Sequence, residues 1–166
     1  MNIRHTKPED LPALLDLFAH AREFMAKTGN PHQWGDNLWP WPEVVEADIK
    51  NQKSYALEEN GELVGTFYLD YGDNPEPCYD VVEHGAWSMP GPYAVIHRIA
   101  SNGKRKGILE AAVRFALTKT HQVRIDTHED NVVMQNALKK IGFQPIGFIY
   151  VEHDVTRRVA FEFIQE

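Results

Sequence analysis

The chain has 166 residues and a mass of 19.0 kDa, a length that predicts one compact domain spanning residues 1–166. With 43% hydrophobic and 25% charged residues, the composition is typical of a globular protein and excludes the disordered, collagen-like and coiled-coil classes. The single cysteine, Cys78, excludes an intrachain disulfide and a multi-cysteine zinc site, and 24 acidic against 17 basic residues argue against a general nucleic-acid binder.

The sequence pattern over residues 1–71 predicts a strand, two helices and a β-hairpin. Asn2–His5 is typical of a short strand, and Thr6 with Glu9 three residues later has the form of a capping box, which makes Thr6 the expected N-cap. Apolar residues recur at helical spacing from Leu11 to Met25, and Gly29 is expected to end that helix. After a loop over 30–42, the pattern predicts a helix and then two strands that turn at Asn60-Gly61, with these bounds: Pro42–Gln52, Ser54–Glu59 and Glu62–Tyr71.

The rest of the chain predicts four more strands and two helices. An irregular stretch, Gly72–Pro92, is interrupted by several prolines and precedes a nearly continuous apolar run, Tyr93–Ala100, that suits a central strand. A helix, a strand, a helix and two antiparallel strands are expected to follow: Gly107–Thr118, Gln122–Thr127, Asn131–Ile141, Phe143–Val151 and Arg158–Ile164. The order β-α-α-β-β-β-α-β-α-β-β predicts an α+β or mixed α/β fold on a partly antiparallel sheet of about seven strands.

A basic, glycine-containing loop joins the predicted central strand to the helix that follows it. Its sequence is Ser101-Asn102-Gly103-Lys104-Arg105-Lys106-Gly107. Free backbone N–H groups, the positive end of the helix dipole and three cations together favour an anion such as a phosphate. Gly103 and Gly107 allow the backbone to approach such a ligand closely. The alternative interpretation is a solvated basic turn without a ligand.

A second segment, Asn131–Phe143, combines a capping residue, apolar positions at helical spacing and a glycine stop. Asn131 lies where an N-cap is expected, and Gly142 follows the last apolar position of the helix, Ile141. Taken alone, this segment is also explained by a capped surface helix, which is a common structure.

These two segments, in this order and bridged by a strand, resemble the GNAT superfamily of acyl-CoA-dependent N-acyltransferases. The basic loop corresponds to the family's pyrophosphate motif, with Lys104 in its Arg/Gln place and Gly107 kept, but Leu109 stands where Gly or Ala is usual. The pattern Asn131…Leu138…Gly142-Phe143 corresponds to the second motif, in which Leu138 replaces the usual tyrosine. The likeness runs from the first strand to Phe163 and is strongest to a bacterial subgroup in these segments: Asn30–Gly35, Gly85–Trp87, Ile96–Ala100 and Arg124–His128.

The resemblance implies the GNAT fold, a mostly antiparallel sheet of about seven strands with about four helices, and acetyl-CoA as co-substrate. In that fold the strand equivalent to Tyr93–Ala100 splays away from the one equivalent to Gln122–Thr127, and its free edge pairs with the pantetheine arm. A backbone N–H near Ile99–Ser101 is expected to stabilise the thioester oxyanion. The residues expected on this basis to bind the cofactor are Ile99, Ala100, Ser101, Lys104, Arg105, Lys106, Gly107, Ile108, Asn131 and Asn136.

Catalysis needs a base, because an alkyl ammonium titrates near about 10.4 and cannot attack while it is protonated. His97 on the central strand is the expected base, and a hydrogen-bonded core histidine is the alternative interpretation. The other candidates for the base are Glu83, Asp126, His128 and Glu152. With a leucine at position 138, Tyr150 is the expected acid, although an amphipathic strand tyrosine explains it equally well.

The loop over 30–42 holds Trp34, Trp39 and Trp41, in the part of the chain where the family places acceptor-side structure. Aromatic rings beside Asp36 suit a cage for a cationic or apolar amine, whereas the alternative is that the tryptophans pin the loop to the sheet. The residues expected to bind the acceptor are Trp34, Asp36, Trp87, Asp126 and His128.

The favoured function is transfer of an acetyl group from acetyl-CoA to the primary amine of a small molecule or peptide, by direct attack in a ternary complex. One alternative is a non-catalytic GNAT-fold module that binds acyl-CoA or another metabolite. Another is a metal-dependent hydrolase built from the 8 histidines with Asp126 and Asp130, although the spacing predicts no metal site. Without a signal-peptide pattern or a long apolar run, we expect a cytoplasmic protein with no membrane or nucleic-acid partner, and the resemblance is compatible with a homodimer.

Overall fold

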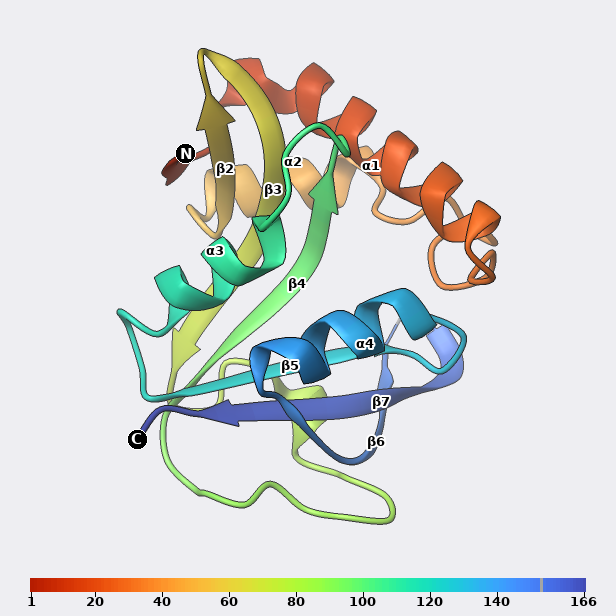
Figure 1. The fold of residues 1–166 in the computed structure, drawn as a ribbon, viewed down its shortest axis with the longest axis vertical. Coiled ribbons are helices and arrows are strands. Elements are labelled where there is room, and N and C mark those ends of the chain that lie inside the picture. Colours follow the sequence, from red (N-terminus) through yellow and green to blue (C-terminus); the bar gives the residue numbers. More distant parts are fainter. Residues whose placement is uncertain (153) are drawn as a thin grey trace.

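The computed structural model describes residues 1–152 and 154–166 and places a seven-stranded sheet at the centre of the molecule (Figure 1). The order of helices and strands is the predicted one, and the predicted GNAT-type α+β fold is confirmed. The elements in chain order are β1 (Asn2–His5), η1 (Pro8–Asp10), α1 (Leu11–Lys27), α2 (Pro42–Lys50), β2 (Ser54–Glu59), β3 (Glu62–Gly72), η2 (Pro77–Tyr79), β4 (Tyr93–Ser101), α3 (Ile108–Ala116), β5 (Gln122–His128), α4 (Val132–Ile141), β6 (Gln144–Val151) and β7 (Asp154–Ile164).

The strands lie side by side in the order β1-β2-β3-β4-β5-β7-β6. Neighbouring strands are antiparallel except for β4 and β5, which are parallel and divide the sheet into an N-terminal and a C-terminal half. The predicted hairpin joins β2 to β3, with Asn60 and Gly61 both at positive φ, 52° and 79°. Such a turn matches the twist of the two strands, which is why Asn-Gly is favoured there.

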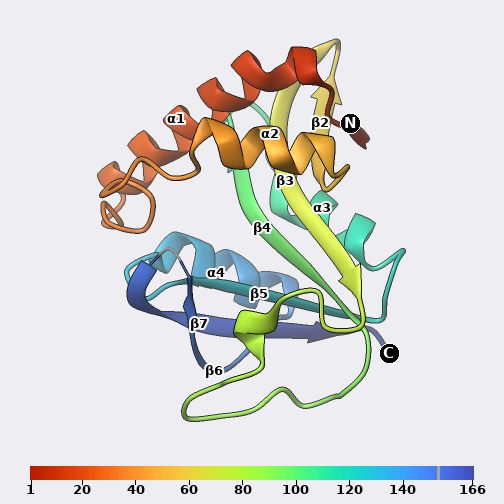
Figure 2. The ribbon, with the colours of Figure 1, turned by 180° about the vertical axis from the view of Figure 1, so that it is seen from behind.

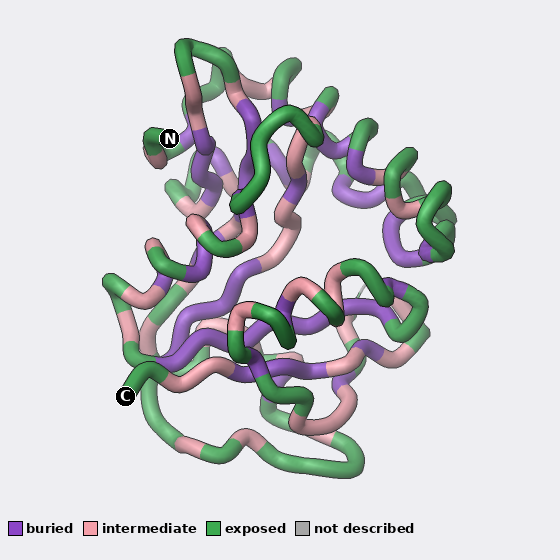
Figure 3. The backbone as a smooth tube through the Cα atoms, in the orientation of Figure 1, coloured by how far each residue is buried: buried purple, intermediate pink, exposed green. Residues whose placement is uncertain are grey.

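Helices cover both faces of the sheet. Seen from behind, α1 and α2 lie across β2, β3 and β4 (Figure 2), where Leu14, Phe18 and Val45 pack with Trp34 of the loop between these helices. On the opposite face α3 and α4 pack against the strands in the largest apolar core. The backbone of β5 is buried along its length (Figure 3), as expected for a strand in the middle of a covered sheet. Among the described residues, no helix is long and apolar enough to cross a membrane.

The start of the first helix differs from the prediction. The Thr6 N–H and hydroxyl both donate to the backbone oxygen of Ser54, at 3.0 and 3.2 Å, so Thr6 stays beside β2, and Lys7 is the N-cap of the turn that follows. Instead, the chain makes the short turn η1, in which the Asp10 carboxylate accepts from the Lys7 N–H at 2.8 Å, and α1 begins at Leu11. The expected capping box at Thr6 is therefore wrong, because the helical turn begins one residue later, with Lys7 and Asp10 in the places expected for Thr6 and Glu9.

The last hairpin is tighter than predicted. Val151 of β6 already pairs with Asp154, so β7 begins at Asp154 rather than at Arg158. The Asp154 carboxylate accepts from the Thr156 N–H at 2.9 Å and from Arg158 at 2.8 Å, which stabilises this early start of the strand.

Candidate active site

Strands β4 and β5 separate after a short region of contact. They are in register only at Ala94 with Val123 and Val95 with Arg124. Beyond these pairs β5 continues beside β7 and β4 continues beside β3, so the two strands open into a V (Figure 1). A cavity of about 640 Å³ lies in this opening, a volume typical of small-molecule sites. One edge of β4 therefore borders a cavity where a neighbouring strand would otherwise lie.

A β-bulge in β4 shapes the wall of this cavity. Register partners place Tyr68 opposite His97 and Thr66 opposite Ala100, so Phe67 alone faces two residues of β4. One of them, Arg98, has a φ of 48°, which is unfavourable for a side chain with a Cβ. Two hydrogen bonds to Asp48, at 2.8 and 3.0 Å, hold Arg98 in this conformation. The bulge thereby changes the direction in which the following residues of β4 face, as bulges beside binding sites commonly do.

His97 lies between two carboxyl groups at the cavity wall. Its Nε2 is 2.7 Å from Oε2 of Glu76, which immediately precedes η2, and its Nδ1 is 3.6 Å from Oδ2 of Asp126 on β5. That Asp126 oxygen also accepts from the Tyr79 hydroxyl at 2.6 Å. The imidazole of β4, the two carboxyl groups and the phenol therefore form one polar cluster across the opening between β4 and β5.

The pKa values of three groups in this region follow from burial and hydrogen bonding. Burial opposes ionisation of Glu76, but hydrogen bonds from His97 and the Cys78 N–H outweigh it and lower the Glu76 pKa. Burial and the nearby Asp126 raise the pKa of Tyr79 well above its usual range, so its hydroxyl remains a donor. Burial and the Glu76 charge raise the pKa of Cys78 to about 11. A thiol with this pKa is a poor nucleophile at neutral pH.

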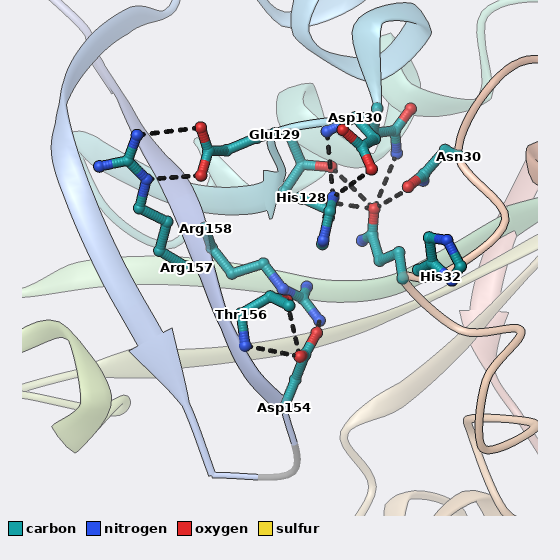
Figure 4. Close-up of polar contacts among 12 residues, drawn as sticks. Asn30, His32, His128, Glu129, Asp130, Asp154, Thr156, Arg157 and Arg158 are labelled. Atoms are coloured by element: carbon teal, nitrogen blue, oxygen red, sulfur yellow. Dashed lines mark hydrogen bonds and ion pairs between the residues drawn. The ribbon is translucent and has the colours of Figure 1, made fainter.

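Arg158 connects this cluster to the β6–β7 hairpin. It is 3% exposed, and its guanidinium lies 3.5 Å from Asp126 and 2.8 Å from Asp154. Figure 4 shows Arg158 and Asp154 facing each other beside the hairpin. Burial opposes ionisation of Asp154, yet its hydrogen bonds with Thr156 and Arg158 lower the pKa to about 2. A single buried cation thus neutralises part of the charge of two carboxylates.

The loop between β4 and α3 forms the other end of the cavity. Gly103 and Gly107 have φ values of 76° and 84°, and a Cβ added at Gly107 would meet no atom within 4 Å. The first N–H groups of α3 follow directly, and such groups have no partner within their own helix. Two of the three cations in this loop are already paired: Lys104 with Glu62 at 2.6 Å and Arg105 with Glu59 at 3.1 Å. An anion bound at this loop would therefore depend more on backbone N–H groups, and less on the side-chain cations, than the three positive charges of the loop suggest.

Gln33 ties the loop between α1 and α2 to the junction of β5 and α4. It is 7% exposed, and its side-chain oxygen accepts from Asn30 Nδ2 at 2.9 Å and from Asn131 Nδ2 at 3.1 Å. The same oxygen accepts from the Thr127 hydroxyl at 3.3 Å and the His128 N–H at 3.4 Å. Figure 4 shows Asn30 and His128 approaching this point from opposite sides. Two walls of the cavity are thus fastened to each other by a single amide.

The structure brings one group of the expected site residues to the cavity. They come from β4, β5, the first turn of α3, the N-cap of α4 and the tryptophan-containing loop. The residues of this group are Trp34, His97, Ile99, Ala100, Ser101, Ile108, Asp126 and Asn131. Asn131 also caps α4, because its Oδ1 accepts from the Met134 N–H at 3.1 Å.

The other expected residues do not line the cavity. Tyr150 is 47% exposed on β6, and its neighbour Ile149 occupies the buried position of that strand. Asn136 is exposed on α4, and Asp36 is exposed and paired with His32 at 2.8 Å. The remaining members of this group are Trp87, Lys104, Arg105, Lys106, Gly107 and His128.

Trp87 lies in a different environment from the one expected. Its ring faces the Arg124 guanidinium at 4.3 Å, and its Nε1 donates to the backbone oxygen of Tyr79 at 2.8 Å. Trp87 therefore packs the segment between η2 and β4 onto the sheet, away from the cavity. His128 behaves similarly, because its Nδ1 accepts from the Asp130 N–H at 3.0 Å within the β5–α4 turn.

The two leucines that depart from the family motifs have different positions. Leu138 is fully buried in the core between α4 and the sheet, so it contributes packing and no chemistry. Leu109, in the first turn of α3, lines the cavity beside Ile108. The apolar surface at this end of the cavity therefore comes partly from Leu109, at a position where the family motif has glycine or alanine.

Sequence reasoning missed three residues of the site: Glu76, Arg158 and Gln33. Glu76 stands in a proline-rich stretch without periodicity, so no pattern indicates that it meets a strand 21 positions later. Gln33 lies inside the segment Asn30–Gly35, whose resemblance to a bacterial subgroup was the available signal. Among the described residues, no group of three or more His, Cys, Asp or Glu side chains is arranged to hold a metal ion.

Comparisons with known proteins agree with this architecture. A family model of the acetyltransferase (GNAT) domain matches residues 1–144, whereas no curated protein matches the sequence significantly. A GNAT-family acetyltransferase from Streptococcus agalactiae is 29% identical, with a TM-score of 0.87 over 99% of this chain and 95% of that chain. A putative acetyltransferase from Staphylococcus aureus Mu50 is 23% identical, with a TM-score of 0.71 over 100% of both chains. A GNAT-like decarboxylase in complex with isobutyryl-CoA shares the fold at 14% identity, with a TM-score of 0.67 over 99% of both chains. The chain belongs to the GNAT acetyltransferase family.

Proposed function

We propose that the protein is an N-acetyltransferase that moves the acetyl group of acetyl-CoA to a primary amine while both substrates occupy the cavity between β4 and β5. The observation that carries the proposal is the 2.7 Å hydrogen bond between His97 and Glu76 at the wall of that cavity. It gives an imidazole next to the open edge of β4, where a thioester and an amine can meet. Family membership supports acyl transfer in general, and the choice of acetyl-CoA and of a primary amine is our proposal.

The residues at one end of the cavity fit coenzyme A. The edge of β4 from Ile96 to Ser101 borders the cavity and can pair with an extended amide-containing chain such as pantetheine. The loop after Ser101 offers left-handed glycines and the N-terminus of α3, which suit a pyrophosphate. The fold is shared by the decarboxylase whose structure was solved in complex with isobutyryl-CoA. Acetyl-CoA would supply an activated acyl group in the form of a thioester.

The protein's own groups then have defined tasks. His97 accepts a proton from the acceptor ammonium, R–NH3⁺, which frees the nitrogen lone pair. As the C–N bond to the thioester carbonyl carbon forms, backbone N–H groups near Ile99–Ser101 stabilise the charge that develops on its oxygen. The nitrogen then gives up a second proton to solvent and the C–S bond breaks. Once the thiolate has taken up a proton, the products are the N-acetyl amine, the free thiol and one proton.

The proposal assigns no general acid. Tyr150 is exposed on β6 and Leu138 is buried in the core, so neither reaches the cavity. A thiolate is a tolerable leaving group, because a cysteine-like thiol titrates near about 8.5. Solvent can therefore protonate it after it leaves.

Calorimetric and thermal-shift titrations test the cofactor end of this proposal. The ligands are acetyl-CoA, CoA and a pantetheine analogue without the pyrophosphate. At about 100 times its dissociation constant, a ligand should stabilise the fold by roughly 2.7 kcal/mol. We expect acetyl-CoA and CoA to bind and the analogue to bind far more weakly. A failure of acetyl-CoA to bind would refute the proposal and would indicate that Leu109 obstructs the site.

A screen of amines in the presence of acetyl-CoA, with free thiol as the readout, tests the reaction itself. Turnover that depends on the amine and is lost in His97→Gln supports an acetyltransferase. Tight binding of acetyl-CoA without turnover of any amine would favour a non-catalytic module that binds acyl-CoA.

A further inference from the structure

We propose that Glu76, His97 and Asp126 together form a subsite for the ammonium group of the acceptor, in which Glu76 positions the base and Asp126 binds the substrate. This inference rests on the proposed function and extends it in two ways. It adds Glu76, which the sequence did not indicate, and it gives His97 and Asp126, which the sequence did indicate, specific atoms and separate tasks. The juxtaposition that supports it is a single imidazole with a carboxyl group on each side, at a cavity wall.

Glu76 determines which nitrogen of His97 carries the proton. The hydrogen bonds that lower its pKa keep Glu76 a carboxylate, and a carboxylate can only accept. The hydrogen in the 2.7 Å contact must therefore belong to Nε2 of His97. In the neutral imidazole the lone pair then lies on Nδ1, because the bond made by one nitrogen sets the state of the other.

The segment that carries Glu76 is held rigidly against the strand that carries His97. The Glu76 N–H donates to the Tyr93 hydroxyl at 3.1 Å, and this hydroxyl lies 3.2 Å from the Glu76 backbone oxygen. One oxygen of the Glu76 carboxylate also accepts from the Cys78 N–H at 3.4 Å. Since Tyr93 and His97 belong to the same strand, the imidazole and its carboxylate partner are fixed relative to each other before any ligand binds.

The opposite side of the imidazole presents a second acceptor. Nδ1 of His97 and Oδ2 of Asp126 are 3.6 Å apart, and no hydrogen bond joins them. The Tyr79 hydroxyl, at 2.6 Å, and Arg158, at 3.5 Å on the other oxygen, keep the Asp126 carboxyl group oriented. Two acceptors at this spacing suit a donor with several hydrogens, and a primary ammonium has three. We infer that it donates one hydrogen to Asp126 and one to Nδ1.

This arrangement gives each group one role in the proton transfer. The hydrogen shared with Nδ1 passes from the ammonium nitrogen to the imidazole, which becomes an imidazolium, and the nitrogen lone pair is released for attack. Asp126 holds the nitrogen in place through the second hydrogen, and Glu76 stabilises the imidazolium through Nε2–H. The imidazolium then loses its proton to solvent, so that one proton leaves per acetyl group transferred.

Charged and titratable groups surround His97 from several elements of the fold. Glu76 comes from the segment before η2, Asp126 from β5 and Arg158 from β7. The Tyr68 ring of β3 lies 5.7 Å from the imidazole and the Tyr79 ring 6.1 Å. The ion pair between Asp48 of α2 and Arg98 lies at the β-bulge of β4, where Arg98 directly follows His97 in the chain.

Nuclear magnetic resonance of the full chain, labelled with nitrogen-15 histidine, tests the tautomer directly and needs no acceptor. The His97 signals are assigned by their absence in His97→Gln. We expect the neutral imidazole to carry its hydrogen on Nε2, and we expect Glu76→Gln to change this tautomer preference. Glu110→Gln is the matched control, since Glu110 is exposed on α3, where it pairs with Arg114. A neutral imidazole that carries its hydrogen on Nδ1 would overturn the proposal.

Titration with a simple ammonium tests the role of Asp126. n-Butylamine should shift the Nδ1 resonance of His97, whereas n-butanol, which has the same chain without the charge, should not. Equal shifts from both compounds, or none from the amine, would contradict an ammonium subsite.

Kinetic measurements with n-butylamine and acetyl-CoA distinguish a positioning role of Glu76 from a purely structural role. Glu76→Gln should lower kcat by about 100-fold near neutral pH, the contribution expected of a working base, while the dissociation constant for acetyl-CoA stays the same. The defect should shrink as the pH approaches about 10, where the free amine is abundant without help. An equal defect at both pH values would overturn the positioning role. Loss of acetyl-CoA binding in the wild type would refute the proposed function instead, so the two failures are distinguishable.

Discussion

Replacing Gln33 with methionine would remove the oxygen that fastens two walls of the cavity while keeping the length of the side chain. That oxygen accepts hydrogen bonds from Asn30, Thr127, His128 and Asn131. All of these partners are buried, so water cannot easily replace the lost acceptor. The substitution is therefore expected to destabilise the fold even though it adds an apolar side chain to a buried position.

The size of the effect follows from the two best donors. Asn30 and Asn131 donate at 2.9 and 3.1 Å and are 1% and 8% exposed, whereas the other two contacts are longer. An unsatisfied buried donor costs about 1–3 kcal/mol, so these two predict a loss of roughly 2–6 kcal/mol in the free energy of unfolding. For a domain of this size each kcal/mol lowers Tm by about 2–4 °C, which predicts a fall of roughly 4–24 °C.

Urea denaturation followed by circular dichroism measures the free energy, and calorimetry measures Tm. Gln33→Glu retains an acceptor oxygen at the same position and should recover part of the loss. Asp36→Ala is the control in the same loop, because it removes only an exposed pair with His32. The reasoning would be refuted if Gln33→Met changed the free energy by less than about 0.5 kcal/mol, the range of ordinary surface substitutions.

Changing Lys104, Arg105 and Lys106 together to alanine should weaken acetyl-CoA binding and reduce its dependence on salt, which calorimetry at two ionic strengths measures. Unchanged affinity would count against the phosphate-loop assignment. Tyr150→Phe should leave both turnover and acetyl-CoA binding as in the wild type, because the side chain lies outside the cavity, and a lower kcat would restore it as a candidate acid. Since the pKa of Asp154 is about 2 in the folded protein and higher in the unfolded chain, its charged form stabilises the fold above pH about 4, and this contribution is lost as the pH falls toward 2. The difference in urea midpoint between wild type and Asp154→Asn should therefore shrink over that interval, and a constant difference would contradict the assignment.

The sequence alone was sufficient for the helices, the strands and their order, because these depend on contacts between neighbours along the chain. Asn60 and Gly61 accept positive φ, so the β2–β3 hairpin has its turn at the expected place. Asn131 caps α4 as predicted, because an Asx side chain reaches the N–H three residues later. Thr6 was misassigned because the group that binds its hydroxyl, the Ser54 backbone oxygen, is 48 positions away.

The arrangement of the candidate active site was decided by tertiary structure. The sequence indicated His97 as a base and Asp126 as a site residue, but their proximity arises where β4 and β5 diverge. Glu76 comes from an irregular stretch and reaches His97 only because Tyr93 anchors its backbone to β4. Tyr150 is the opposite case, a residue that the sequence indicated for the site but that lies outside the cavity. Side chains alternate along β6, so Ile149 points inward and Tyr150 points to solvent.

There is a physical reason why the sequence predicted the helices and strands but not the arrangement of the cavity. Periodicity, capping and turn propensity act within a few residues, and a single sequence displays them directly. The links that build the cavity join positions far apart, as when Gln33 bonds a residue 98 positions later, and each side chain looks ordinary in its own segment. Packing brings these side chains together, because the helices must cover both faces of a sheet that divides between β4 and β5. Local patterns thus determined the helices, the strands and their order, and the resemblance of two motifs indicated the fold family, whereas long-range packing determined which polar groups face the cavity.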